Sequence, residues 1–334
     1  MHKRNLVFFD TTHSLHVDRI LSEFEKIEWE VEYRNYNQGP VEPHKILFFG
    51  HVDSIPKHLL DVKNPKIGIS WAYDIYSHIN NTIRMECLLN SFEKLDLLVV
   101  DCEYVAGIAK KIGMDANKIL ILPYGVSLED YSYKKIKRRR KKIFNIYSNR
   151  NWEVGYGQST LLEAIKRLVE NQIEVALHLS GDGRTRVELL NKYRQLIESG
   201  VVIYHGRVTP KKNRTLLINA DVYVSASEYD GWSVSILESL AVGTPVIAAD
   251  IEPNVDLLDS GKNGILFENR NPNSLYSQLE SFIDDPNDTR NVEAFRMSGR
   301  EKVEVSCNFE SNVLDLSRLL QTKFLSLKDS SGFY

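Results

Sequence analysis

The chain has 334 residues, which suggests about two domains with substantial cores, and its hydrophobic content of 43% is ordinary. No apolar run approaches the ~20 residues that span a bilayer, and the basic start passes directly into a strand pattern without a leader-like apolar region. The 42 basic and 45 acidic side chains nearly balance, and three scattered cysteines exclude a disulfide framework or a zinc cluster. We therefore expect a cytoplasmic protein.

Short apolar runs alternate with helical patterns in the first 130 residues. The helical patterns include residues 13–27 and 102–113. The runs typical of strands are residues 5–10, 29–36, 45–50, 66–71, 95–101 and 118–124. This alternation predicts a mostly parallel sheet covered on both faces, so residues 1–130 are expected to form one Rossmann-like domain.

A basic connector follows at residues 131–142. Its Lys134–Lys142 stretch holds eight of the 42 basic residues, which leaves 34 against 45 acidic residues elsewhere, a net charge of −11. Charge concentrated in this way can bind an anionic membrane or an acidic polysaccharide, or can form a solvated hinge. Nucleic acid is the weakest alternative, because neither interleaved aromatic residues nor a nucleic-acid-binding motif accompanies the charge.

A second alternation occupies residues 143–308. Its strand patterns begin at 142–147 and continue at 174–181, 201–206, 222–227, 245–250 and 264–268. From about Ser274 the pattern is helical, and residues 308–327 read as one amphipathic helix within a C-terminal segment, residues 309–334. The fold class is therefore α/β, with two Rossmann-like domains in sequence.

The stretch Asp221–Glu268 is the most informative part of the chain. Asp230 and Glu238 stand eight positions apart across Gly231, where a buried strand gives way to a helix that opens near Ser233. The unpaired N–H groups at a helix start favour an anion, and eight helical residues span roughly 12 Å. Two carboxylates at this spacing can hold opposite ends of one ligand the size of a sugar nucleotide.

The same stretch resembles the signature of the retaining GT-B glycosyltransferases, the glycogen synthase-like "glycosyl transferases group 1" family. That signature has Glu-Gly-Phe-Gly, a second Glu eight residues after the first, and a Gly-Thr-Pro-Val turn. This chain has Asp230–Ser233 (Asp-Gly-Trp-Ser), Glu238 and Gly243–Val246. The resemblance implies two Rossmann-like domains facing across a cleft, with the acceptor side in the first, the donor side in the second and a C-terminal helix that crosses back to the first.

The resemblance also implies roles on the donor side. Glu238 would hold the ribose hydroxyls, unless it is only a surface carboxylate. Asp230 would hold the donor sugar together with the loop, in which Trp232 alternatively packs as an aromatic. The residues implied to bind the donor are Gly231, Trp232, Ser233, Val234, Glu238, Tyr156 and Arg207.

The family normally supplies an arginine and a lysine to the leaving diphosphate. Arg150 can serve as the arginine, whereas Tyr156 stands at the lysine position before Gly157, unless the loop alignment slips. A phenol donates one hydrogen bond but carries no charge near neutral pH, so charge stabilisation is expected to depend on Arg150 and a helix N-terminus.

Acceptor-side candidates lie in the first half. The family often has a His-Asp pair after its fourth strand, where this chain has Tyr73-Asp74. Asp74 is expected either to orient an acceptor hydroxyl, as a catalytic residue, or to cap a helix. Thr12 and His13 replace the usual paired glycines after the first strand. His13 and His16 have helical spacing, but packing is favoured over a metal pair because no further ligand clusters with them.

The resemblance implies a nucleotide-sugar-dependent glycosyltransferase of the hexosyltransferase type that acts with retention and without a metal ion or cofactor. The expected donor is a UDP- or GDP-sugar, and the acceptor a glycan or lipid-linked saccharide in polysaccharide biosynthesis. Because many relatives extend lipid-linked glycans, an anionic membrane is the preferred partner of the connector, which places the protein peripherally on the inner face. The main alternative is a catalytically weak sugar-nucleotide-binding subunit that supports a partner enzyme.

Overall fold

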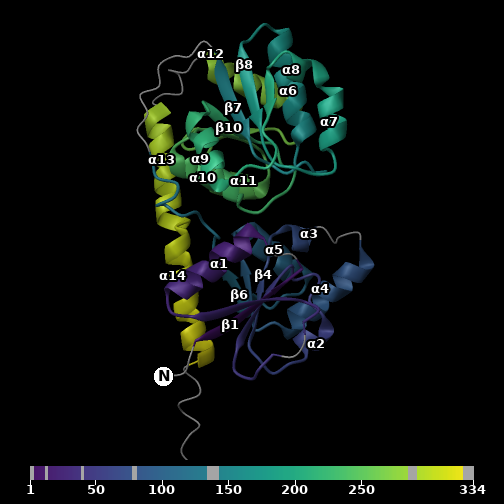
Figure 1. Ribbon diagram of the computed structural model, residues 1–334, viewed down its shortest axis with the longest axis vertical. Coiled ribbons are helices and arrows are strands. Elements are labelled where there is room, and N and C mark those ends of the chain that lie inside the picture. The colour runs from purple at the N-terminus through teal and green to yellow at the C-terminus, as the bar shows by residue number, and fades with distance from the viewer. Residues whose placement is uncertain are drawn as a thin grey trace, which may run out of the picture. The chain divides into compact units, whose positions relative to one another are not determined.

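The computed structural model describes residues 4–11, 14–38, 41–76, 81–133, 143–284 and 292–325. The chain divides into two compact units, Met1–Tyr124 with Phe309–Tyr334, and Gly125–Asn308. Each unit has a six-stranded sheet with helices packed around it, which confirms the α/β fold class (Figure 1). The basic connector Lys134–Lys142 lies outside the described residues.

The sheet of the first unit is parallel, with the strand order β2-β1-β3-β4-β5-β6. Its strands are β1 (Asn5–Asp10), β2 (Glu30–Asn35), β3 (Ile46–Gly50), β4 (Lys66–Ile69), β5 (Leu97–Val100) and β6 (Ile119–Ile121). Its helices are α1 (Leu15–Lys26), α2 (Lys57–Leu60), α3 (Tyr73–Tyr76), α4 (Thr82–Lys94), α5 (Glu103–Ile112) and α14 (Phe309–Leu320), with a 3₁₀ turn at Ala116–Lys118.

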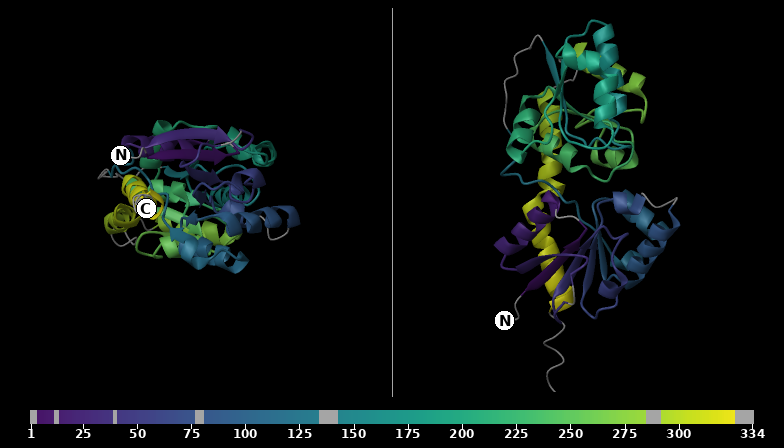
Figure 2. Two further views of the ribbon diagram at one scale, coloured as in Figure 1. Left: turned by 90° about the horizontal axis from the view of Figure 1, so that it is seen from below. Right: turned by 45° about the vertical axis from the view of Figure 1, so that its right-hand side comes forward.

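Helices cover both faces of this sheet, α1 and α14 on one face and α2 and α4 on the other (Figure 2). In β1, Leu6 and Phe8 join the core under α1 and α14, while Val7 and Phe9 point the opposite way and are also fully buried. Burial on both sides explains why the strands read as continuous apolar runs.

The C-terminal helix α14 packs on the first unit, as the sequence predicts. Val313 and Leu316 of α14 lie in the core of that unit. The indole Nε1 of Trp29 donates a 2.8 Å hydrogen bond to Ser317 Oγ, and Arg19 stacks on the Phe309 ring at 4.4 Å. The helical run continues past α14 as one π-helical turn, Gln321–Leu325.

The second unit also has a parallel sheet, in the order β12-β11-β10-β7-β8-β9. Its strands are β7 (Phe144–Ser148), β8 (Val175–Leu179), β9 (Val202–Tyr204), β10 (Val222–Ser225), β11 (Val246–Ala249) and β12 (Ile265–Phe267). Its helices are α6 (Gln158–Glu170), α7 (Arg186–Lys192), α8 (Arg194–Glu198), α9 (Pro210–Asn219), α10 (Val234–Val242), α11 (Glu252–Leu257), α12 (Pro272–Asp284) and α13 (Val292–Ser306).

Alternate residues of the central strands feed two cores in the second unit. Val224 of β10 packs in the core that includes residues of α6 and α12, whereas Tyr223 packs with residues of α9 and α10. The polar residues that follow these strands are therefore held at the carboxyl edge of a rigid sheet, where ligands of parallel α/β sheets bind.

Candidate functional site

The loop between β10 and α10 forms as the glycine-containing motif predicts. Ser233 is the N-cap residue of α10, and the helix ends at Gly243. Gly243 has a φ angle of 76°, a left-handed conformation that glycine adopts without strain. The start of α10 therefore lies directly after the loop that contains Asp230 and Gly231.

Arg150 is the centre of the polar contacts of this loop. It follows β7, is 9% exposed, and donates through Nε to Ser227 Oγ (3.0 Å), through Nη1 to Ser233 Oγ (2.6 Å) and through Nη2 to Asp230 Oδ2 (2.5 Å). Burial lowers the pKa of the guanidinium, but the charge of Asp230 and neighbouring tyrosines outweighs burial, so that the pKa is raised. Arg150 therefore stays charged and holds the loop in place.

Asp230 is fixed through both carboxylate oxygens. Oδ2 pairs with Arg150, and Oδ1 accepts the backbone N–H of Gly231 at 3.0 Å. The structure thus brings together four residues that the sequence assigns to the donor side, Arg150, Asp230, Gly231 and Ser233. Two of them, Arg150 and Asp230, are 80 positions apart in the chain.

Tyr156 joins the same group through its ring, whose centroid lies 4.8 Å from the guanidinium carbon of Arg150. It stands between two glycines in left-handed conformations, Gly155 (φ 89°) and Gly157 (φ 70°). A Cβ at Gly157 would lie 1.8 Å from the carbonyl oxygen of Ala226. Glycine at this position therefore lets the turn before α6 approach the loop after β10.

Glu238 lies on α10, half-buried, at one end of a hydrogen-bond network. Its Oε2 accepts from Asn213 Nδ2 at 2.9 Å. Asn213 Oδ1 accepts from the Tyr147 hydroxyl at 2.7 Å and from Asn149 Nδ2 at 2.9 Å, and the Tyr223 hydroxyl donates to Asn149 Oδ1 at 2.8 Å. The network orients the carboxylate of Glu238.

The partners of Glu238 in this network were missed in the sequence. Burial raises the pKa of both Tyr147 and Tyr223 well above the ordinary tyrosine value, so both hydroxyls remain donors at neutral pH. Tyr147 comes from β7, Asn213 from α9 and Tyr223 from β10, and the adjacency of β7 and β10 brings them together. Polar residues in otherwise apolar strands were the available signal.

The remaining donor-side candidates make other contacts. Trp232 donates through Nε1 to Asp256 Oδ2 at 3.1 Å, and the ammonium of Lys302 lies 5.2 Å from its ring centroid. Val234 begins α10. Arg207 follows β9 and lies 3.7 Å from a carboxylate oxygen of Asp182, with 84% of its side chain exposed. Arg207 therefore contacts the loop after β8, whereas Arg150 contacts the loop after β10.

On the acceptor side, Thr12 and His13 lie outside the described residues. Tyr73 begins α3 and is about half exposed. Asp74 is buried, and its Oδ2 accepts the Val52 N–H at 3.0 Å while its Oδ1 accepts the Ser70 hydroxyl at 2.7 Å. Burial raises the pKa of Asp74 to about 6. Asp74 thus ties the loop after β3 to the loop after β4.

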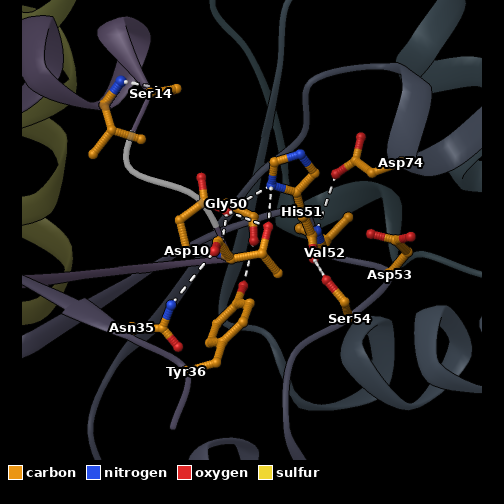
Figure 3. Close-up of polar contacts among 12 residues, drawn as sticks. Asp10, Ser14, Asn35, Tyr36, Gly50, His51, Val52, Asp53, Ser54 and Asp74 are labelled. Carbon is orange, nitrogen blue, oxygen red and sulfur yellow. Dashed lines mark hydrogen bonds and ion pairs between the residues drawn. The ribbon is translucent and has the colours of Figure 1, made fainter. Parts of the chain in front are cut away.

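Asp10 and His51 form a second close pair that the sequence patterns did not single out (Figure 3). Asp10 ends β1 and His51 follows β3, and the order β2-β1-β3 makes these strands neighbours. His51 Nδ1 lies 2.5 Å from Asp10 Oδ1. Burial lowers the pKa of His51, but the hydrogen bond with Asp10 and the charges of Asp10, Asp74 and Asp53 outweigh burial and raise it. The signal that could have indicated this pair is that Asp10 and His51 both lie at the carboxyl ends of strands in one parallel sheet.

No cluster of three or more His, Cys, Asp or Glu side chains that could hold a metal ion occurs within the described ranges. His16, one of the two histidines at helical spacing, packs its ring 5.7 Å from that of Trp71. None of the helices in those ranges combines the length and the apolar character that a membrane crossing requires.

Comparison with known proteins extends these observations. The family model for glycosyl transferases group 1 matches residues 130–298, half of the chain. WcaL of Salmonella typhimurium, a glycosyltransferase named for colanic acid biosynthesis, is 25% identical over 237 residues, which cover 69% of this chain and 58% of WcaL. The chain therefore spans little more than half the length of this curated relative.

Solved structures resemble nearly the whole chain. Anabaena HepE in complex with UDP-glucose has a TM-score of 0.77 at 13% identity, and the match covers 95% of this chain and 99% of HepE. Sucrose-phosphate synthase from Thermosynechococcus elongatus has a TM-score of 0.80 at 14% identity, with 97% and 100% covered. At these identities the likeness is one of fold, and the fold is GT-B.

Proposed function

This chain belongs to the glycosyl transferases group 1 family, and we propose that it moves a sugar from a UDP-sugar to a hydroxyl of a glycan or lipid-linked saccharide. The observation that carries the proposal is the charged pair of Arg150 and Asp230, fixed where β10 leads into α10. UDP is the preferred nucleotide because HepE, a structural neighbour, was solved with UDP-glucose. A GDP-sugar is the second donor to test.

Glu238 would bind the ribose of the donor. A carboxylate accepts hydrogen bonds from both hydroxyls of a ribose diol, and the bond from Asn213 fixes its plane before the donor arrives. This preorganisation lowers the entropy lost on binding. Gly231, Trp232, Val234 and Arg207 remain proposed donor contacts.

Arg150 would bind the diphosphate. A guanidinium has five N–H groups, and those that hold Ser227, Ser233 and Asp230 leave others for phosphate oxygens. The backbone N–H groups at the start of α10 favour the same anion. These groups replace the charge that a metal ion would supply, so we propose a metal-independent reaction.

The proposed reaction retains the configuration of the sugar. The bond between the sugar and the diphosphate breaks with its electrons on the phosphate, and the sugar passes through an oxocarbenium-like state. The acceptor oxygen then bonds to the same face, and its proton passes to a phosphate oxygen of the leaving nucleotide. Asp230 would contact the sugar, while Asp74 would serve the acceptor side through the loops that it joins.

A catalytically weak donor-binding subunit is the second candidate function. Tyr156 places a neutral ring, rather than an ammonium, against Arg150, so the diphosphate has one cation fewer. Loss of that charge would slow departure of the nucleotide more than it would weaken binding of the donor. Such a subunit would bind UDP-sugars without turnover.

The connector Lys134–Lys142 is proposed to hold the protein on the anionic inner face of a membrane. Replacing Arg138, Arg139 and Arg140 with Gln is expected to weaken binding to phosphatidylserine liposomes, most strongly at low salt. Transfer to a small water-soluble acceptor should continue at the parent rate. Equal liposome binding by the parent and the triple variant would remove the membrane from the proposal.

The decisive experiment incubates the purified chain with UDP-glucose, UDP-galactose, UDP-N-acetylglucosamine and GDP-mannose, with and without EDTA. Calorimetry measures binding, and chromatography measures released nucleotide and transferred sugar. The proposal predicts binding and slow hydrolysis of at least one UDP-sugar, unchanged by EDTA. Binding without any hydrolysis or transfer favours the subunit, and absence of binding contradicts both candidates.

A further inference from the structure

His51 and Asp10 form a polarised pair at the carboxyl ends of β3 and β1. Asp10 is fully buried, whereas the side chain of His51 is 34% exposed. Asp10 Oδ1 also accepts the backbone N–H of Thr11 at 2.6 Å, so this oxygen acts as an acceptor and Nδ1 of His51 is assigned the proton in their 2.5 Å contact. In the neutral imidazole Nε2 then holds a lone pair, and Figure 3 shows this nitrogen on the side of the ring away from Asp10. Among the described residues, Nε2 has no hydrogen-bond partner.

The surroundings of Asp10 are closely fitted. A Cβ at Gly50 would lie 2.4 Å from Asp10 Oδ2, so only glycine leaves room for the carboxylate. The Tyr36 hydroxyl donates to the Gly50 carbonyl and holds this strand end. Asp10 Oδ2 is buried, and no described residue donates to it. An unpaired buried carboxylate oxygen costs stability, so a contribution to the fold does not account for Asp10 at this position.

The turn that carries His51 is also fixed. His51 has a φ of 51°, in the left-handed region that residues other than glycine enter uncommonly, although histidine, asparagine and aspartate do so more often than most. The next residue, Val52, donates its N–H to Asp74, and Ser54 Oγ donates to the His51 carbonyl at 3.0 Å. The imidazole is therefore held in one orientation before any ligand binds.

The charge around His51 selects a neutral ligand. Asp10, Asp53 and Asp74 all act on the imidazole. Within the described ranges Asp53 pairs with Arg84 at 3.0 Å, and Asp10 pairs with His51 itself when the imidazole is protonated, so the neutral imidazole stands among net negative charge. Carboxylates repel a phosphate but accept hydrogen bonds from hydroxyl groups. A sugar hydroxyl suits this environment, and a nucleotide diphosphate does not.

We propose that His51 is an acceptor-binding residue whose Nε2 accepts a hydrogen bond from a hydroxyl of a neutral saccharide. Asp10 is its positioning residue, because it fixes the proton on Nδ1 and leaves Nε2 free to accept a hydrogen bond from the saccharide. This assignment rests on the proposed function and deepens it by naming the residue and the acceptor class. It differs from the sequence expectation for Asp74, whose two oxygens are occupied by Val52 and Ser70.

The test uses the full chain labelled with ¹⁵N-histidine and follows the His51 ring nitrogens by NMR above the pH at which the imidazole becomes neutral. His51→Asn assigns the resonance, and asparagine tolerates the left-handed backbone. His44→Asn is the matched control, because His44 is exposed and also has a positive φ of 81°. The probes are methyl α-D-glucopyranoside, methyl α-D-galactopyranoside and methyl N-acetyl-α-D-glucosaminide, with inorganic pyrophosphate as the anionic arm.

At least one glycoside is expected to shift His51 Nε2 saturably, whereas pyrophosphate should not. Asp10→Asn should move the proton from Nδ1 to Nε2, because an amide can donate to Nδ1, and should weaken glycoside binding at least about threefold. A structural role for Asp10 would leave the tautomer unchanged. A shift with pyrophosphate alone, no shift with any probe, or an unchanged tautomer in Asp10→Asn overturns the proposal.

Binding of UDP-glucose, measured on the same samples, separates this proposal from the proposed function. His51→Asn should bind UDP-glucose within about twofold of the parent and the His44→Asn control, because Arg150 and Glu238 are unchanged. If UDP-sugars bind the parent but no glycoside moves His51, only the assignment of His51 fails. If no nucleotide sugar binds the parent, the proposed function fails as well.

Discussion

The polar clusters at the carboxyl ends of the two sheets differ in charge and in hydrogen bonding. In the second unit a cation is at the centre: all three guanidinium nitrogens of Arg150 donate, and both oxygens of Asp230 accept. In the first unit three carboxylates act on His51, and Asp10 Oδ2 has no partner among the described residues. The same sheet geometry thus presents one cluster suited to a diphosphate and another suited to neutral hydroxyl groups.

Substitution of Arg150, the cation at the centre of the second cluster, should have the largest effect on activity. Arg150→Lys keeps the charge but cannot maintain three hydrogen bonds in a fixed plane, so kcat for the best UDP-sugar should fall by about 100-fold or more. Arg184→Lys is the matched control, since its side chain is 85% exposed in the same unit. A kcat within threefold of the parent would show that Arg150 does not act on the leaving group.

Glu238→Ala should come next in size. Loss of charge-assisted hydrogen bonds to ribose costs about 1.5 to 3 kcal/mol, so the Kd for UDP-glucose should rise about 10- to 150-fold with the fold intact. Glu188→Ala, an exposed carboxylate on α7, provides the control. Calorimetry decides the point, and an unchanged donor affinity in Glu238→Ala would remove the ribose assignment.

Ionisation of Asp74, in the cluster of the first unit, should make the free energy of unfolding depend on pH. Burial raises its pKa from 3.8 to about 6 in the folded state, so ionisation is less favourable in the folded than in the unfolded chain. The free energy of unfolding should therefore fall as pH rises from about 4 to about 6, by roughly 3 kcal/mol from this group, and level off above. Asp74→Asn should lack this component in urea titrations. If the free energies of unfolding of parent and variant change with pH in parallel, the pKa of Asp74 is not raised in the folded chain.

Tyr156→Phe should have the smallest effect. The ring face contacts Arg150, and phenylalanine preserves that contact while it removes one hydrogen-bond donor. A two- to fivefold decrease in kcat is expected, in line with the loss of one neutral hydrogen bond of about 0.5 to 1 kcal/mol. A decrease near that of Arg150→Lys would instead make the phenol a principal ligand of the diphosphate.

Sequence patterns predicted the strands and helices of each unit better than the contacts between side chains within that unit. The boundaries of α10 follow from local chemistry, because Gly243 ends the helix in a left-handed conformation. The pair of Arg150 and Asp230 joins residues 80 positions apart, and the pair of Asp10 and His51 depends on β1 lying next to β3. Neither adjacency is encoded in a local pattern.

The network behind Glu238 shows the same limit. Asn213 and Tyr147 carry no motif, and their contact arises because α9 packs over β7. Polar residues in otherwise apolar strands, and one in a helix that packs on the sheet, are the local signs of such a contact. The sequence therefore indicated the residues that we propose bind the donor, and the structure shows the residues that position them.

Turnover by the parent chain and by Asp230→Asn tests the central claim that the cluster of Arg150 and Asp230 is a working donor site. Each protein is incubated with the UDP-sugar that the parent binds best, and released UDP is measured with and without saccharide acceptors. We predict turnover by the parent and a loss of about 100-fold or more in Asp230→Asn, with UDP binding retained within about threefold. Absence of turnover with every donor and acceptor, or equal rates for both proteins, would contradict this account.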